Sequence, residues 1–268
     1  MTVTLQPLAG ERWGRIEAAK RRLLYTLLSL KLPITGLTFA FPETGLTGHA
    51  NGLITIVQSE ADDAERERRR LAFHEPLRTL VCHLRHESGH FYFDRLIRGS
   101  PRLLEVRAAF GDEAVDYGQS LTGYYASGPR ADWPSSCITA YATAHPLEDW
   151  AETWAHYLHM IDAVELLVAY GLRLSPTTVG SNGSAPADPA TDLAAVPRDP
   201  LNGSFDDLLA AWTPLTCLAN SLNRNLGLQD WYPFVMCPAV INKLRLIHGI
   251  VADHRTGAVQ AEAAAHGS

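Results

Sequence analysis

The chain has 268 residues, of which 46% are hydrophobic and 19% are charged, and its formal net charge is −6. These values are typical of a globular protein with a substantial core, and the acidic balance argues against a nucleic-acid-binding surface. No apolar stretch is long enough to cross a bilayer, Met1–Gly10 lacks a signal-peptide pattern, and the four cysteines form no C-x-x-C pair. We therefore expect a cytoplasmic protein without disulfides and without nucleic-acid or membrane partners.

The first part of the chain predicts one helix and two short strands. Glu11–Lys31 carries apolar residues at helical spacing and ends before Pro33. Leu37–Phe41 and Gly52–Val57 are rich in residues that favour β-strands and are bounded by turn residues, whereas Pro42–Ala50 between them is turn-rich.

The next two segments predict helices. One begins near Glu60, and its mixed-sign run Glu65–Arg70 is interpreted as a solvated helix face rather than as a binding patch. The other runs from Pro76 to Arg98 and contains the sequence His86-Glu87-Ser88-Gly89-His90. Positions i and i+4 share a helix face, so His86 and His90 can bind one metal ion.

Glu87 adds catalytic chemistry to this motif. A carboxylate next to the first histidine lies beside the metal, where it can accept a proton from a bound water. Apolar side chains on more than one side of the helix predict that it is buried. A buried His-Glu-x-x-His without a partner would be costly, and a metal supplies that partner.

The order of a helix, strands, a helix and the motif helix fits the catalytic half of a zincin. We expect an α+β, mostly helical zincin-like fold with a small β-sheet over the active-site helix. An edge strand of that sheet could bind an extended peptide through backbone hydrogen bonds. Leu53–Val57 is our candidate for the edge strand, and an interior position in the sheet is an equally consistent interpretation.

The remaining elements complete one predicted domain over residues 1–254. The expected helices are Arg102–Ala109, Glu113–Ala126, Leu147–Gly171, Phe205–Leu226 and Pro238–Val251. Residues 175–204 are rich in Pro, Gly, Ser, Ala and Asp, which predicts a flexible excursion. Residues 255–268 are predicted to form a disordered tail.

A later helix offers the third metal ligand. A catalytic zinc takes three protein ligands and a water, and Leu96 stands where a metzincin would have its third histidine. Glu148 and Glu152 share one helix face, so one can bind zinc while the other orients a ligand histidine. We assign Glu148 as the ligand and place Glu152 and His156 behind the ligands. The reverse order of the two glutamates, and His145 or His156 as ligand, are the alternatives.

These motifs resemble a bacterial family of zinc-binding metallopeptidases. The resemblance covers most of the chain and is carried by Arg85–Leu96, Phe110–Glu113, His145–His159 and Phe205–Ile247. It implies a gluzincin-like zincin that binds one Zn²⁺ per chain and cleaves a peptide or protein substrate. Family members often begin with a four-cysteine zinc ribbon, which we expect this chain to lack. The glutamate pair is also similar to the glutamate helix of lethal-factor-type zinc proteases.

The expected reaction is hydrolysis of a peptide bond by a zinc-activated water, with Glu87 as general base. Tyr141, shortly before the glutamate helix, is the candidate donor to the oxyanion. Tyr117, Tyr124 and Tyr157 are its rivals. Two other functions remain open: a non-peptidase zinc amide or ester hydrolase, and a catalytically inactive zinc-bearing interaction module. Glu87 argues against the second, because a structural zinc site needs no base. The sequence makes no prediction of oligomeric state.

Overall fold

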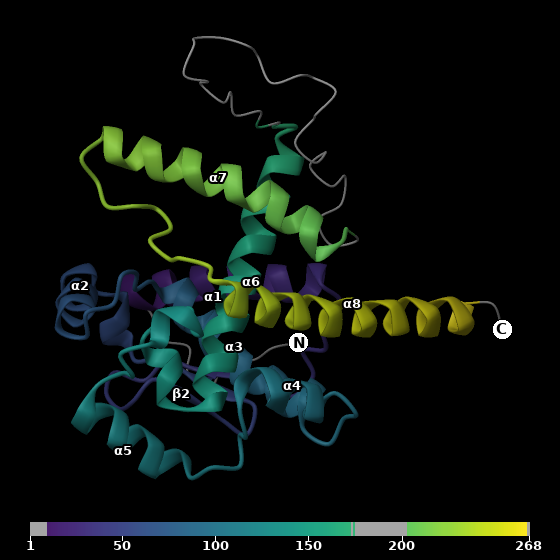
Figure 1. Cartoon of the computed structure of the whole chain (residues 1–268), viewed down its shortest axis with the longest axis horizontal. Helices are drawn as coiled ribbons and strands as arrows, with labels where there is room; N and C mark the ends of the chain where they lie inside the picture. The colour runs from purple at the N-terminus through teal and green to yellow at the C-terminus, as the bar shows by residue number, and fades with distance from the viewer. Residues whose placement is uncertain (1–9, 173, 175–202, 267–268) are drawn as a thin grey trace. The chain divides into compact units, whose positions relative to one another are not determined.

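The computed structural model describes residues 10–172, 174 and 203–266, and this part of the chain is mostly helical (Figure 1). Its α-helices are α1 (Glu11–Ser29), α2 (Asp63–Ala72), α3 (Leu80–Tyr92), α4 (Leu103–Phe110), α5 (Tyr117–Ser127), α6 (Pro146–Ala169), α7 (Phe205–Asn225) and α8 (Pro238–His266). Shorter helical turns are η1 (Gln58–Ala61), η2 (Phe93–Ile97), η3 (Trp133–Ser135) and η4 (Tyr141–Ala144). The strands are β1 (Thr38–Ala40), β2 (Gly48–Ala50) and β3 (Leu53–Thr55). The predicted α+β, mostly helical fold class is confirmed.

The chain divides into two compact units where the sequence predicted one domain. The first comprises Met1–Tyr157 and Phe234–Ser268, and the second comprises Leu158–Pro233. The predicted excursion, residues 175–204, lies outside the described residues except for residues 203 and 204. Residues 255–268 were expected to form a disordered tail. In the structure, α8 continues to His266 through an alanine-rich segment of high helix propensity. No helix among the described residues is long and apolar enough to cross a membrane.

The three strands form one mixed sheet in the order β1-β3-β2. β1 is parallel to β3 and β2 is antiparallel to it, so β3 is the interior strand. Our assignment of Leu53–Val57 to the edge of the sheet is therefore wrong, and the interior alternative is confirmed. The edge strand is β2, which falls in the segment predicted as turn-rich. Asn51 and Gly52 connect it to β3 with φ of 50° and 83°, a two-residue hairpin turn typical of Asn-Gly.

The motif helix is shorter than the predicted 76–98 segment. It begins at Leu80, where the Thr79 hydroxyl accepts a hydrogen bond from the Cys82 backbone N–H at 3.1 Å. It ends at Tyr92 and continues as the π-helical turn η2, closed by the Arg98 N–H and the Phe93 carbonyl at 2.9 Å. The His-Glu-x-x-His motif therefore lies within the regular part of α3.

α3 packs closely against α6, and one glycine makes this possible. A Cβ atom on Gly89 would lie 2.8 Å from the Cα atom of Ala151, closer than two packed carbons can approach. The indole N–H of Trp150 donates to the Gly89 carbonyl at 2.9 Å, and that of Trp154 donates to the Ser88 hydroxyl at 3.1 Å. Both indoles are fully buried. Close backbone contact and two buried hydrogen bonds thus fix the motif helix on the glutamate helix.

The second unit has an aromatic core of its own. The His159 ring contacts the rings of Trp212, Trp231 and Tyr232, at centroid distances of 5.7, 5.0 and 5.6 Å. The Asn220 side chain pairs with the backbone of Tyr232, donating to its carbonyl at 3.1 Å and accepting from its N–H at 2.9 Å. This amide ties the segment after α7 to the helix.

Candidate metal centre

Three predicted ligands converge between α3 and the first turn of α6. Nε2 of His86 lies 3.0 Å from Oε2 of Glu148, and Nε2 of His90 lies 3.5 Å from Oε1 of the same carboxylate. The two Nε2 atoms are 3.3 Å apart. The ligand atoms of all three residues lie within 4.8 Å of one another, a spacing that lets them hold one metal ion. Regular i,i+4 geometry on α3 and the close approach at Gly89 produce this convergence.

The donor set fits a zinc ion. Oε1 of Glu152 lies 2.6 Å from Nδ1 of His86, so the carboxylate holds a hydrogen on Nδ1 and directs the Nε2 lone pair toward the cluster. Oε2 of Glu148 is buried and makes no hydrogen bond with any described residue. Two imidazole nitrogens and a carboxylate oxygen that face one another repel unless a cation lies between them. Two nitrogens and one oxygen are a ligand set that zinc accepts.

The electrostatics of the metal-free site show the same need for positive charge. Burial alone would lower the pKa of His86, but its contacts with the Glu148 and Glu152 carboxylates raise it well above its ordinary value. Burial would likewise raise the pKa of Glu148, but the two histidines and Tyr117 hold it at about 2. Burial and the charge of His86 lower the pKa of His90 to about 4. Without a metal, a proton on His86 therefore supplies the only cation within this triad.

Glu87 is buried beside the triad with an unusually weak acidity. Its side chain is 8% exposed, and burial raises its pKa to about 7, with neighbouring carboxylates adding to the effect and His86 opposing it. A carboxylate with a pKa near neutrality can accept a proton and later return it. The predicted base thus has the chemical character that the role requires.

The four candidate tyrosines occupy different places. The Tyr117 hydroxyl donates to Oε1 of Glu148 at 2.6 Å. The Tyr141 ring lies 6.1 Å from the His86 ring, and Tyr124 packs on Tyr141 at 5.6 Å. Tyr157 instead lies in a buried contact with His248 of α8, with its hydroxyl 3.3 Å from Nδ1. The structure brings Tyr117 and Tyr141 to the candidate metal ligands and places Tyr157 elsewhere.

His145 and His156, the alternative ligands, have other partners. Nδ1 of His145 accepts from the Leu147 N–H at 3.0 Å, and its Nε2–H donates to the Val115 carbonyl at 3.1 Å. Both ring nitrogens are therefore engaged in fixing the start of α6. The His156 ring packs on Phe234 at a centroid distance of 4.4 Å. Burial lowers its pKa to about 4, and the charge of nearby Glu152 opposes this shift.

Sequence reasoning missed two supports of the site. His49 on β2 stacks on His90, with centroids 6.5 Å apart and planes 14° from parallel, and its Nε2 accepts from the Gly52 N–H at 3.1 Å. Lys243 of α8 donates to Asp149 at 2.5 Å and to the Ser136 carbonyl at 2.6 Å. This buried ion pair anchors the first turn of α6. The Asn-Gly hairpin could have located His49, but no local signal identifies the partner of Asp149.

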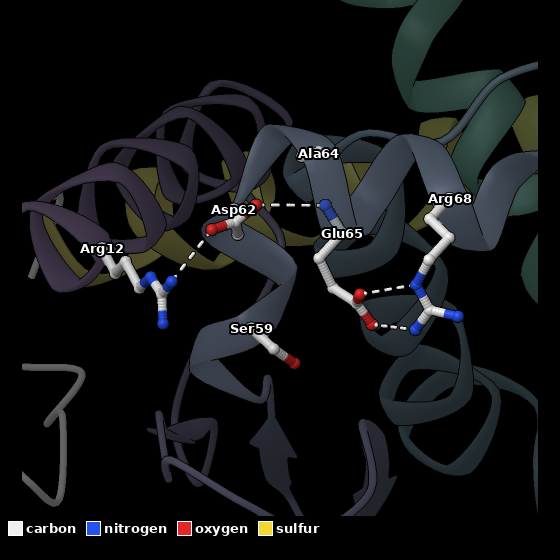
Figure 2. Close-up of a pocket in the computed structure, with 6 residues that line it drawn as sticks. All are labelled: Arg12, Ser59, Asp62, Ala64, Glu65 and Arg68. Atoms are coloured by element: carbon white, nitrogen blue, oxygen red, sulfur yellow. Dashed lines mark hydrogen bonds and ion pairs between the residues drawn. The ribbon is translucent and has the colours of Figure 1, made fainter.

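A surface pocket of about 460 Å³ lies on other elements, α1, η1 and α2 (Figure 2). Its lining residues are Arg12, Ser59, Asp62, Ala64, Glu65 and Arg68. Arg12 donates to Asp62 at 2.9 Å, and Arg68 makes two hydrogen bonds to Glu65 at 2.9 and 2.8 Å. Because these charges already pair with one another, the pocket lacks the converging unpaired groups of the metal centre.

Comparison with known proteins gives the relatives of this chain. Residues 9–250 match the family described as "Putative zinc-binding metallo-peptidase". Uncharacterized proteins of Mycobacterium tuberculosis and Mycobacterium bovis are each 41% identical over 254 residues, which cover 90% of this chain and 70% of each relative. No solved structure matches. The resemblance inferred from the motifs is confirmed, and the chain belongs to this zinc-binding metallopeptidase family.

Proposed function

We propose that the protein is a zinc-dependent, gluzincin-like metallopeptidase with one catalytic site per chain. The observation that carries this proposal is the convergence of His86, His90 and Glu148, with Glu152 behind His86. A zinc ion held by these three residues would acidify a water and polarise the carbonyl of the scissile bond.

Glu87 supplies the proton transfer in this proposal. It accepts a proton from the attacking water and delivers it to the amine nitrogen that leaves. Its pKa of about 7 supports both directions of transfer near neutral pH. A closed structural zinc site would have no use for such a base, which favours catalysis over a purely structural role.

Tyr141 is the oxyanion donor in this proposal. Tyr117 has a single hydroxyl hydrogen, and that hydrogen is already donated to Glu148. Tyr141 lies near His86, with ring centroids 6.1 Å apart, and burial, nearby Glu148 and a hydrogen bond with Tyr125 raise its pKa, so its hydroxyl remains protonated. A donor directed at the developing negative charge stabilises the transition state.

The substrate proposed here is a peptide or protein chain. β2 is an edge strand, and its residue His49 stacks on the ligand His90. An extended peptide can therefore add to this edge by backbone hydrogen bonds and reach the metal ligands. We further propose a cytoplasmic location without a membrane partner. Because the net charge is −6, we propose no nucleic-acid partner.

The test combines zinc analysis with digestion of a peptide library. We expect about one zinc per chain, and we expect Glu87→Gln to retain zinc while peptide hydrolysis falls by roughly 10²- to 10⁴-fold. Glu105→Gln, which alters an exposed glutamate of α4, serves as the control.

Three outcomes would contradict parts of the proposal. A wild-type protein that takes up no zinc would remove the metal centre. Cleavage of small amides or esters without cleavage of any peptide would favour the non-peptidase hydrolase, and zinc binding without any hydrolysis would favour the interaction module. Loss of zinc from Glu87→Gln, as expected for His86→Ala, would show that Glu87 acts on the metal and not on the water.

A further inference from the structure

We propose that Tyr117 is a positioning residue of the metal centre. It hydrogen-bonds one oxygen of Glu148 and leaves the other oxygen as the single metal-binding atom of that carboxylate. The inference rests on the proposed zinc site and adds a residue to it.

The two oxygens of Glu148 have different surroundings. Oε1 accepts the hydroxyl hydrogen of Tyr117 at 2.6 Å, a short distance typical of a hydrogen bond to a charged carboxylate. Oε2 makes no hydrogen bond with the described residues and lies 3.0 Å from Nε2 of His86. Oε2 is therefore the oxygen that a metal bound to both histidines would take.

Tyr117 is held in place independently of Glu148. It is the first residue of α5, whose N-terminus is capped by the Asp116 side chain, which accepts from the Gln119 N–H at 2.7 Å. Its ring makes an edge contact with the His145 ring, at 5.0 Å between centroids and 71° between planes. His145 in turn hydrogen-bonds the carbonyl of Val115, two residues before Tyr117. The hydroxyl thus approaches Glu148 from a fixed direction although the residue is 42% exposed.

This geometry has a consequence for metal coordination. A carboxylate that binds through two oxygens fills two coordination positions, whereas one that binds through a single oxygen fills one. A zinc ion held by His86, His90 and one oxygen of Glu148 would retain a coordination position for water or substrate. Tyr117 therefore keeps the site catalytic by occupying Oε1.

The two possible roles of Tyr117, orienting Glu148 or donating to the oxyanion, predict losses of different quantities when its hydroxyl is removed. If Tyr117 orients Glu148, removal of its hydroxyl weakens metal binding. If Tyr117 donates to the oxyanion, removal lowers the turnover number while zinc affinity stays unchanged. The two roles are separated by a measurement that does not depend on activity.

The experiment measures zinc affinity by competition with a chelator. Tyr117→Phe retains the ring and its contact with His145 and removes only the hydroxyl. We expect its zinc affinity to fall by roughly 10- to 100-fold, as for other residues that support a metal ligand. The control is Tyr170→Phe, an exposed tyrosine just after α6, which should bind zinc as the wild type does.

Two further measurements make the result specific. In the cobalt(II)-substituted protein, Tyr117→Phe should weaken the visible absorption bands, because Oε1 becomes free to bind and the coordination number rises. In a Glu148→Gln background, Tyr117→Phe should cause little additional loss of zinc affinity, because the two residues act as a unit.

Equal zinc affinity in Tyr117→Phe and wild type would overturn the inference, whether or not turnover falls. Additive losses in the double variant would also overturn it. Zinc-free wild-type protein would instead contradict the proposed function, so the two failures are distinguishable.

Discussion

Two buried carboxylates in the first unit differ in what surrounds them. Glu60 and Glu148 are each 1% exposed. Oε1 of Glu60 accepts hydrogen bonds from Arg69 at 2.7 Å and from Arg78 at 3.0 Å. Glu148 has no arginine or lysine among its hydrogen-bond partners in the described chain, and faces two imidazoles and a phenol.

The comparison shows that hydrogen-bond and ion-pair partners, and not acidity, separate the candidate metal ligand from the carboxylate of a structural ion pair. Burial alone would raise the pKa of both carboxyl groups, and in both cases the surrounding residues lower it instead. For Glu60 the lowering comes from His83 and from the guanidinium groups of Arg78 and Arg69, and the two guanidinium charges are permanent. The groups around Glu148 are two imidazoles and a phenol, none of which is permanently charged, so a proton on His86 or a bound cation has to supply the positive charge.

The largest expected effect breaks the comparison directly, by removing each carboxylate in turn. Glu148→Ala should fold and be nearly metal-free. Glu60→Ala should keep its zinc but lose roughly 3 kcal/mol of unfolding free energy, because two guanidinium groups lose a buried partner. Zinc analysis of the purified variants measures metal retention. Urea denaturation of both variants, after removal of the metal, measures the change in unfolding free energy. Zinc loss from Glu60→Ala with retention in Glu148→Ala would show that the two clusters have been assigned the wrong way round.

The next largest effect separates the two glutamates of α6, Glu148 and Glu152. Glu152 accepts from Nδ1 of His86 and does not belong to the three-ligand group. Glu152→Ala should therefore retain zinc with affinity lower by roughly 10- to 100-fold, in contrast to Glu148→Ala. Titration against a chelator ranks the two variants. The opposite ranking would move the ligand one turn along the helix, with His156 as its supporting residue.

The smallest expected effect tests the contact between α3 and α6, which brings Glu148 to the two histidines. Gly89→Ala places a methyl group against Ala151, which should cost about 1–3 kcal/mol and separate α3 from the ligand on α6. Gly123→Ala is the matched control, because its added methyl contacts nothing within 4 Å. The control should gain about 0.5–1 kcal/mol from helix propensity. Equal stability changes in the two variants would mean that the contact is not tight.

Much of the site could be predicted from local spacing alone. His86 and His90, and later Glu148 and Glu152, stand four residues apart in segments with helical patterns, so each pair had to share a face. Helix packing then brings the faces together. The proposed division of roles between the glutamates comes from the chemistry of metal ligands, and the structure places the two carboxylates at different nitrogens of His86.

Other parts depend on contacts that local patterns do not contain. β2 has only three residues, too few for strand periodicity, and was assigned to a turn-rich segment although Asn51-Gly52 indicates a hairpin. The hydroxyl of Tyr117 reaches Glu148 across 31 positions of sequence. Glu60 is buried against Arg69 of α2 and Arg78 before α3. Arg69 belongs to the run Glu65–Arg70, which locally has the pattern of a solvated helix face.

The indoles of Trp150 and Trp154 give this protein a built-in optical reporter. Both rings are fully buried and donate their N–H groups to the motif helix, one to the Gly89 carbonyl and one to the Ser88 hydroxyl. Indole emission shifts to longer wavelength when the ring meets water. Any separation of the motif helix from the glutamate helix therefore changes the intrinsic fluorescence. A variant or a condition that separates these two helices can thus be recognised without a label, a substrate or a modified residue.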